Sequence, residues 1–331
     1  MLICGSCRCG NIPFTHGPGI LRVRINTALP ADSGKNGATV KYDTVVIVYV
    51  RRPVAAVYAL LSGSSGGCMT TADANAPLRY WRDGGIAHIR FNRPAVLNAI
   101  DVPTANAFLA ACQAARGDSG VRVVVVSGEG RAFIAGGDLA AMKGNPVETA
   151  RALIEPMHGG IALLAAMDAP VLASLHGVVA GGGLGVALAC DLAIAAEGTR
   201  FNLAYVNIGA SSDCSTSWAL PRLVGMRRAL EIALLGETFD AAEAWRIGLI
   251  NRVVPAASLR EETDRLARRL AEGPPLALGR LKRLMRDSLN STLQEQLDAE
   301  AEGFAACAAT RDFAEGVNAF FEKRSPRYQG K

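Results

Sequence analysis

From about residue 80 onward, the apolar positions alternate between short continuous runs and helical spacing. A short apolar run that ends in a turn predicts a buried strand, whereas apolar positions three or four residues apart predict a helix. The runs lie at 86–91, 121–128, 170–177, 191–197 and 248–254, and helical spacing fills much of 256–322. This alternation predicts an α/β core, with a helical C-terminal part packed on it or on a neighbouring subunit.

The first 68 residues have a different pattern. They are rich in glycine, serine and proline, with no sustained helical period, and the stretches ALPADSGKNGAT and LLSGSSGGC are typical of flexible linkers. At Met69 the chain changes to a stretch that resembles a natural N-terminus leading into a first strand. We therefore expect 1–68 to be a disordered extension upstream of a natural start at Met69. Residues 69–265 are expected to form the core and 266–331 a helical C-terminal part.

The charge is unevenly distributed along the chain. Its net value is +5, but residues 1–68 carry seven basic and two acidic residues, leaving 28 of each for 69–331. A neutral main domain is a poor electrostatic match for nucleic acid. The most apolar stretch, TVVIVYVRRPVAAVYALL, is interrupted by Arg51, Arg52 and Pro53 and does not predict a membrane span. We expect a cytoplasmic protein with neither nucleic acid nor membrane as a partner.

Three of the eight cysteines lie together near the N-terminus, in CGSCRCG. Cys4, Cys7 and Cys9, with His16 nearby, are half of a possible zinc site, since thiolates and imidazole are the ligands that zinc takes. A second ligand pair at the matching spacing is missing from the sequence. Chance clustering is therefore the favoured interpretation, and no metal is expected.

Two glycine turns are the main candidates for chemistry. Gly181, Gly182, Gly183 and Gly185 lie in SLHGVVAGGGLGVALACD, after a predicted strand and at the start of a predicted helix. They do not complete the G-x-G-x-x-G/A pattern of dinucleotide-binding proteins, because valine or leucine occupies the sixth position. Glycines at this point either form a tight, closely packed turn or leave backbone amides open to a ligand.

The second turn favours the open-amide interpretation. In GRAFIAGGDLAAM, Ala135, Gly136 and Gly137 also follow a buried strand and lead into an expected helix. Two such turns can direct two amide N–H groups at one oxygen and stabilise an enolate or a tetrahedral oxyanion.

The chain from about residue 80 to its end resembles the crotonase family of enoyl-CoA hydratases and isomerases. The matching stretches include IRFNRPAVLNAID, VVVVSGEGRAFIAGGDLAAM, PVLASLHGVVAGGGLGVALACDLAIAAEGTRF, LPRLVGMRRALEIALLGETFDAAEAWRIGLINRVVP and FFEKRSPRYQG. The resemblance implies a spiral of ββα units, a homotrimer or a homohexamer built as a dimer of trimers, and a C-terminal trimerisation part. It also implies an acyl-CoA thioester substrate, with coenzyme A arriving as part of it, and no metal or redox cofactor.

The resemblance places the oxyanion-hole amides at Gly137 and Gly182. Ala135, Gly136, Asp138 and Leu139 would line the channel for coenzyme A, with Asp138 as a structural residue beside it. Further along, Lys282 and Arg283 would either meet the phosphates of coenzyme A or lie on a solvated helix face, and the solvated face is favoured.

This sequence also departs from the family. The two glutamates with which hydratases activate water fall here on Gly185 and Tyr205, and neither can act as that acid or base at neutral pH, tyrosine titrating near 10. Asp213 occupies the place of the carboxylate in isomerase members, and its loop is similar to that of ring-epoxide isomerases of phenylacetate-type pathways. Without that position, Asp213 would be taken as a solvated loop residue. A single carboxylate suffices to move a proton between two carbons.

Three alternatives stay open besides an isomerase. One is an enoyl-CoA hydratase. A second is an aryl-CoA dehalogenase-like hydrolase, with Asp213 as nucleophile and His158 as base, since the chlorobenzoyl-CoA dehalogenase also resembles this chain. The third is a non-catalytic homologue that binds acyl-CoA or RNA.

Overall fold

The computed structural model describes residues 21–24, 45–48 and 75–331. The chain divides into two units, 1–63 and 64–331, which are described separately. In the first unit, β1 (Leu21–Arg24) and β2 (Val45–Val48) pair in antiparallel fashion. The remainder of 1–68, including the three clustered cysteines, lies outside the described residues, so its predicted disorder and lack of metal stay predictions.

The second unit is built on a six-stranded sheet. Its order is β11-β8-β6-β5-β4-β3, parallel throughout except that β3 runs antiparallel to β4. The strands are β3 (Leu78–Asp83), β4 (Ile86–Phe91), β5 (Val123–Gly128), β6 (Val171–Leu175), β8 (Leu192–Ala196) and β11 (Arg252–Val254). Each of the five predicted strands overlaps one of these, which confirms the predicted α/β core.

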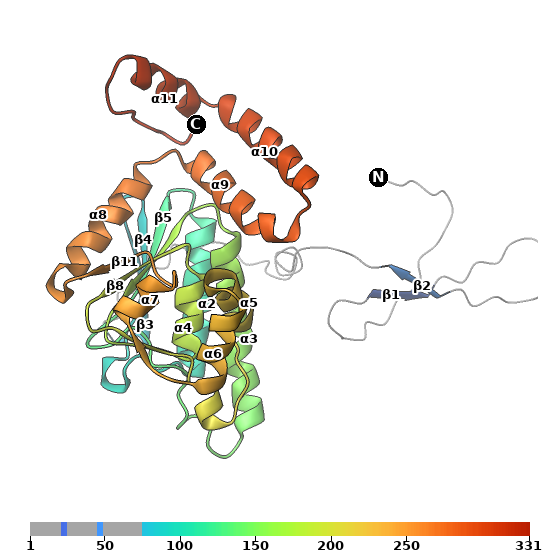
Figure 1. Cartoon of the computed structure of the whole chain (residues 1–331), viewed down its shortest axis with the longest axis vertical. Coiled ribbons are helices and arrows are strands. Elements are labelled where there is room, and N and C mark those ends of the chain that lie inside the picture. Colours follow the sequence, from blue (N-terminus) through green and yellow to red (C-terminus); the bar gives the residue numbers. More distant parts are fainter. Residues whose placement is uncertain (1–20, 25–44, 49–74) are drawn as a thin grey trace, which may run out of the picture. The chain divides into compact units, whose positions relative to one another are not determined.

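Helices cover both faces of this sheet, which is why its central strands read as continuous apolar runs. On one face, Val123 and Val125 of β5 pack with Leu259 and Ala267 of α8 (Leu259–Ala271). On the other face, α2 (Val102–Gly117) contacts β3 and β4 and lies beside α3 (Pro146–Ala166). Figure 1 shows α8 and α2 on opposite sides of the strands.

A smaller three-stranded sheet holds the first glycine turn. It consists of β7 (Val178–Ala180), β9 (Arg200–Asn202) and β10 (Phe239–Asp240), in the order β10-β9-β7. Helix α4 (Gly182–Ala189) begins two residues after β7 ends, and all its residues are buried. Because α4 is surrounded by protein, it needs no polar face, which explains its unbroken apolar and glycine sequence.

The remaining helices lie mainly in the C-terminal half, and the helical pattern predicted over 256–322 is confirmed. The α-helices are α5 (Thr216–Val224), α6 (Met226–Leu235), α7 (Ala241–Arg246), α9 (Pro275–Asp287), α10 (Leu293–Ala308) and α11 (Arg311–Phe321). The 3₁₀ helices are η1 (Pro94–Val96), η2 (Val206–Ile208), η3 (Ala256–Ser258) and η4 (Ser288–Asn290). In Figure 1, α10 and α11 extend away from the sheet. Within the described ranges, no helix has the length and apolar character needed to cross a bilayer.

The prediction of a helix directly after the second glycine turn is wrong. Residues 139–142 form only a turn, closed by i to i+3 bonds such as Ala141 N–H to the Asp138 carbonyl (3.1 Å), and the next helix begins at Pro146. The Asp138 carboxylate accepts from Ala140 N–H (3.2 Å), which favours a turn over a continuing helix. Gly144, with φ of 93°, then ends the segment.

Candidate active site

The structure brings the two glycine turns into contact. Gly136 (φ 119°) and Gly181 (φ 50°) both adopt the left-handed backbone that favours glycine. A Cβ on Gly181 would lie 3.5 Å from the Cα of Gly136. The segments leading into the turns run side by side, because Ile134 and Val179 form a parallel bridge. The predicted pairing of the turns is therefore present in the fold.

The amides of Gly137 and Gly182 are free to bind a ligand oxygen. Ile100 donates to the Gly136 carbonyl and accepts from Asp138 N–H, both at 2.8 Å, so the intervening Gly137 N–H points to the other side of the segment. Gly182 is the first residue of α4, where N–H groups have no acceptor within the helix. Neither amide has an acceptor among the described residues. Their role as an oxyanion hole stays a prediction that this geometry permits.

The loop that carries Asp213 and Cys214 and the side chain of Tyr205 both lie next to Gly182. A Cβ on Gly182 would lie 3.4 Å from the Sγ of Cys214, 3.7 Å from Ile100 Cδ1 and 3.9 Å from the hydroxyl of Tyr205. The open side of Gly182 therefore faces the loop that carries Asp213 and Cys214. Residues predicted from three separate parts of the sequence meet at this point.

Tyr205 and Asp213 form a direct hydrogen bond, in which the phenol donates to Oδ1 of the carboxylate. Burial raises the pKa of Tyr205 well above its ordinary value, with further contributions from Cys214 and Asp213. Tyr205 is therefore neutral and remains a donor at physiological pH. Ala204, directly before it, has a φ of 58°, an uncommon conformation for a residue other than glycine.

His158, on the exposed side of α3, contacts the same loop from another direction. Its Nε2 accepts from the backbone N–H of Cys214 at 3.1 Å. A neutral imidazole whose Nε2 accepts carries its proton on Nδ1, an assignment that follows from this hydrogen bond. The structure thus brings His158 to the loop of Asp213, in contact with its backbone.

The predicted channel residues lie at the second turn. Asp138 forms an ion pair with Arg93 at 3.2 Å, which agrees with a structural role. Ala135 N–H donates to the Leu97 carbonyl at 3.0 Å, and the Leu139 side chain is about half exposed. That these residues and Gly136 line a channel for coenzyme A stays a prediction.

The interpretation of Lys282 as part of a solvated face is wrong. Its side chain is only 5% exposed and forms an ion pair with Asp191 at 2.7 Å. It also donates to the carbonyls of Leu164 (2.8 Å) and Ala169 (3.1 Å). The predicted helix is present, but the acidic partner Asp191 lies 91 positions earlier in the chain, and nothing in the sequence around Lys282 indicates it. Arg283, beside it, pairs with Asp168 nearer the surface.

Sequence reasoning missed the contributions of Cys214 and Ile100. Both act through backbone atoms or packing, namely the Cys214 amide that binds His158 and the Ile100 backbone that orients Gly137. A backbone amide carries no residue signature, so no motif could have predicted these contacts. No group of three or more histidine, cysteine, aspartate or glutamate side chains in the described part of the chain is arranged to hold a metal ion.

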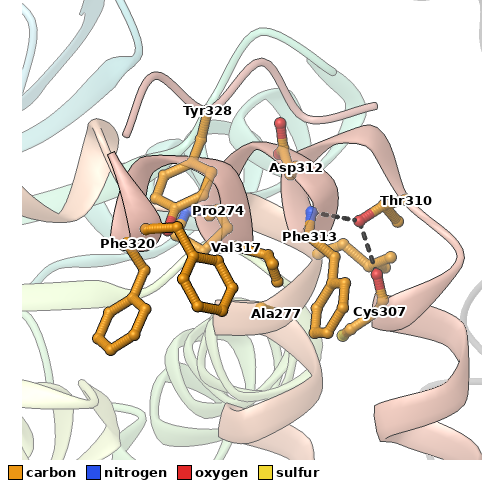
Figure 2. A pocket seen from close by; sticks show the side chains of 12 residues that line it. Pro274, Ala277, Cys307, Thr310, Asp312, Phe313, Val317, Phe320 and Tyr328 are labelled. Atoms are coloured by element: carbon orange, nitrogen blue, oxygen red, sulfur yellow. Dashed lines mark hydrogen bonds between the residues drawn. The ribbon is translucent and has the colours of Figure 1, made fainter. Parts of the chain in front are cut away.

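A separate apolar pocket of about 400 Å³ lies among α9, α10, α11 and the C-terminal tail. Figure 2 shows Phe313, Val317, Phe320 and Tyr328 around it. The carboxylate in its lining, Asp312, accepts from the N–H groups of Gln329 and Gly330 and so holds the tail rather than a ligand. This pocket contains neither glycine turn nor Asp213, and it is not the proposed catalytic site.

Comparisons with known proteins show what this chain is similar to. The model of the family "Enoyl-CoA hydratase/isomerase" matches residues 82–331. The "Probable enoyl-CoA hydratase" of Rhodobacter capsulatus is 38% identical over 77% of this chain and 98% of its own length. The 1,2-epoxyphenylacetyl-CoA isomerase of Escherichia coli is 36% identical, over 75% of this chain and 96% of its own.

A solved structure gives the same result for the fold. The crystal structure of an enoyl-CoA hydratase from Polaromonas sp. JS666 has a TM-score of 0.73 and 32% identity, covering 76% of this chain and 99% of that one. This likeness confirms the predicted crotonase-type α/β fold.

Proposed function

Because the chain belongs to the enoyl-CoA hydratase/isomerase family, we propose that it is an acyl-CoA isomerase that moves a double bond by a proton shuttle through Asp213. The observation that carries the proposal is the position of Asp213. Its carboxylate binds the Tyr205 hydroxyl, and that hydroxyl lies within 4 Å of the Cβ position over Gly182.

The proposed reaction needs one base and one oxyanion site. Gly137 and Gly182 N–H groups bind the thioester oxygen, and the Asp213 carboxylate removes a proton from the carbon next to the carbonyl. The electron pair moves into a dienolate whose oxygen the two amides stabilise. The protonated Asp213 then returns the proton two carbons further along, which shifts the double bond and regenerates the carboxylate. This shuttle requires no metal or redox cofactor.

Hydration by paired carboxylates fits the site less well. Position 185 has no side chain, and the Tyr205 phenol, with its raised pKa, is no base at neutral pH. Water activation in the manner of two glutamates would therefore lack both of its groups. The retained Asp213 also argues against a homologue that only binds acyl-CoA, and the neutral charge of 69–331 argues against RNA binding.

A dehalogenase-like hydrolysis needs a base besides the Asp213 nucleophile. His158 is the candidate for this base, but its Nε2 lone pair is occupied by the Cys214 amide. Its Nδ1 then carries the proton, so the neutral ring has no free nitrogen to accept one from water. The geometry therefore supports an isomerase over an aryl-CoA dehalogenase.

Assembly into trimers, alone or in pairs, belongs to the same proposal. Large apolar side chains are exposed on the helices after residue 215: Trp218, Leu223, Met226, Leu230, Leu234, Leu235, Trp245, Met285, Leu289, Leu293, Phe304, Phe320 and Phe321. An exposed apolar surface of this extent is typical of a subunit interface. Size measurement by light scattering tests this part of the proposal.

The catalytic proposal is tested with Asp213→Asn, which preserves shape and removes the base. Wild type and variant are assayed in D2O on 3-enoyl-CoA, 2-enoyl-CoA and halobenzoyl-CoA. We expect wild type to shift the double bond of 3-enoyl-CoA, and the variant to be slower by about 10² to 10⁴. Asp83→Asn, a surface change at the exposed end of β3, is the matched control.

Unchanged isomerisation in Asp213→Asn would overturn the proposal. Thioester binding without turnover of any substrate by wild type would favour the acyl-CoA-binding alternative. Halide release from halobenzoyl-CoA would favour the dehalogenase.

A further inference from the structure

The loop that carries Asp213 has an unfavourable backbone conformation. Cys214 (φ 48°) and Ser215 (φ 61°) are consecutive left-handed residues, and neither is glycine. Such conformations are costly, and they persist only when surrounding contacts enforce them. The contacts that enforce this pair of residues therefore also constrain the backbone from which Asp213 projects.

The peptide unit between Asp213 and Cys214 is held at both ends. Its carbonyl, on Asp213, accepts from Thr216 N–H (3.1 Å) and from the Thr216 hydroxyl (2.8 Å). Its N–H, on Cys214, donates to Nε2 of His158 at 3.1 Å. Because a peptide unit is planar, fixing both groups fixes the orientation of the plane and the place of the Asp213 Cα in it, from which the side chain extends.

The two ends depend on different parts of the chain. Thr216 is the first residue of α5, the helix that directly follows the loop in the chain. His158 comes from α3, more than 50 positions earlier, and connects the loop to the body of the protein. His158 is thus the acceptor that ties the loop backbone to a separate element.

We propose that His158 is a positioning residue, which directs the Asp213 carboxylate by accepting the Cys214 amide. Together with the Tyr205 hydroxyl, it fixes Asp213 from two sides: Tyr205 binds the side chain and His158 the backbone. This inference rests on the proposed function in one respect, that Asp213 is the base.

Removal of the acceptor has a specific consequence. Cys214 is 1% exposed, and His158→Leu places an apolar side chain where its amide now has an acceptor. An unsatisfied buried N–H is costly, and the strained loop relieves it by rotating the peptide towards another acceptor. Rotation of that peptide displaces Asp213, while the Gly137 and Gly182 amides stay in place. The catalytic step is therefore affected more than substrate binding.

The test distinguishes a role of His158 as a hydrogen-bond acceptor from a role as a base. His158→Gln keeps an acceptor oxygen close to the place of Nε2 but provides no base, whereas His158→Leu removes both. We expect His158→Leu to lower kcat for 3-enoyl-CoA by about 10²-fold with KM changed little, since small displacements of a catalytic group cost about that much. We expect His158→Gln to recover most of kcat. Glu155→Leu, at an exposed position of α3, is the control and should retain wild-type kcat.

A double variant shows whether His158 acts through Asp213. If it does, His158→Leu lowers kcat no further in an Asp213→Asn background, because the two losses are not additive. Equal losses in His158→Gln and His158→Leu, or wild-type kcat in His158→Leu, would overturn the positioning role. Additive losses in the double variant would overturn it as well, and this comparison holds even where the single variant lowers stability. Full activity of Asp213→Asn alone would instead overturn the proposed function.

Discussion

Gly185 and Cys214 lie so close together that no side chain fits between them. A Cβ on Gly185 would lie 2.4 Å from the Cys214 carbonyl oxygen and 2.5 Å from the Cys214 Cβ. The loop that presents Asp213 therefore occupies the space into which a side chain at position 185 would point. A carboxylate at 185 and this path of the loop exclude each other, so glycine at 185 is required for Asp213 to stand where it does.

Substitution of Gly185 therefore destabilises the protein and does not create a hydratase. We expect Gly185→Ala to lower the free energy of unfolding by about 1–3 kcal/mol, because overpacking against backbone cannot be relieved by a side-chain rotation. Gly185→Glu should also lose isomerase activity without gaining hydration of 2-enoyl-CoA. Urea unfolding measures the loss of stability, and assays of isomerisation and of hydration measure the two activities.

Gly117→Ala is the matched control, since a Cβ there would meet nothing within 4 Å at the end of α2. Wild-type stability in Gly185→Ala, or efficient hydration by Gly185→Glu, would contradict the steric argument.

Replacement of two adjacent glycines of α4 by alanine should have opposite effects, one on activity and the other on stability. A Cβ on Gly182 meets nothing closer than 3.4 Å, so Gly182→Ala should fold with wild-type stability. Its methyl group, however, would enter the gap shared with the Tyr205 hydroxyl, and kcat/KM should fall by about 10²-fold as oxyanion binding is lost. A Cβ on Gly183 would lie 2.3 Å from the Ile134 carbonyl, so Gly183→Ala should mainly lower stability. Equal activity of Gly182→Ala and wild type would exclude Gly182 from the site.

The sequence predicts the parts of this fold that have long, regular patterns. The strand expected at 86–91 coincides with β4, whereas β7, β9 and β10 have only two or three residues each and left no periodic signal. The prediction of a helix after Gly137 is wrong because the side-chain oxygen of Asp138 competes for the backbone amides.

The candidate site is predictable only in part, for a similar reason. The two glycine turns are visible in the sequence, but Asp213 among its serines is distinguished only by the family resemblance. The contacts that orient it, the Cys214 amide on His158 and the left-handed loop, belong to the backbone. Lys282 reads as a surface residue because its partner Asp191 is remote in sequence.

The ion pairs of Asp191 should contribute strongly to stability. Its carboxylate binds Lys282 and Arg286, each at 2.7 Å, and accepts from Val171 N–H at 2.8 Å. Asp191→Asn leaves the buried ammonium group without a counterion, and we expect a loss of about 3–5 kcal/mol in urea unfolding at pH 7. Lys282→Met, which removes the charge and keeps the length, should cost less. A larger loss in Lys282→Met than in Asp191→Asn would contradict this assignment.

The same variant should show a characteristic pH dependence. Burial lowers the pKa of Lys282 below its ordinary 10.5, and Asp191 opposes that effect. Without Asp191 the folded pKa falls further, so the unfolded chain binds more protons between that value and 10.5, and stability rises with pH. The deficit of Asp191→Asn relative to wild type should therefore shrink from pH 7 towards pH 10. A constant deficit over this range would show that Lys282 charge is not the cause.

Glu315 should stabilise the C-terminal tail, and this stabilisation should be lost at acid pH. Its carboxylate accepts from Arg324 at 2.6 and 2.9 Å and from Arg327 N–H at 2.8 Å, and these bonds lower its pKa from 4.5 to about 2. A lowered carboxylate pKa gives stability that is complete above pH 4.5 and is lost as the pH falls through about 2. The stability difference between wild type and Glu315→Gln should follow that course in urea unfolding at pH 7, 5, 3 and 2. Glu300→Gln, on the exposed side of α10, should show no such trend, and a Glu315→Gln difference independent of pH would refute the ion pair as its source.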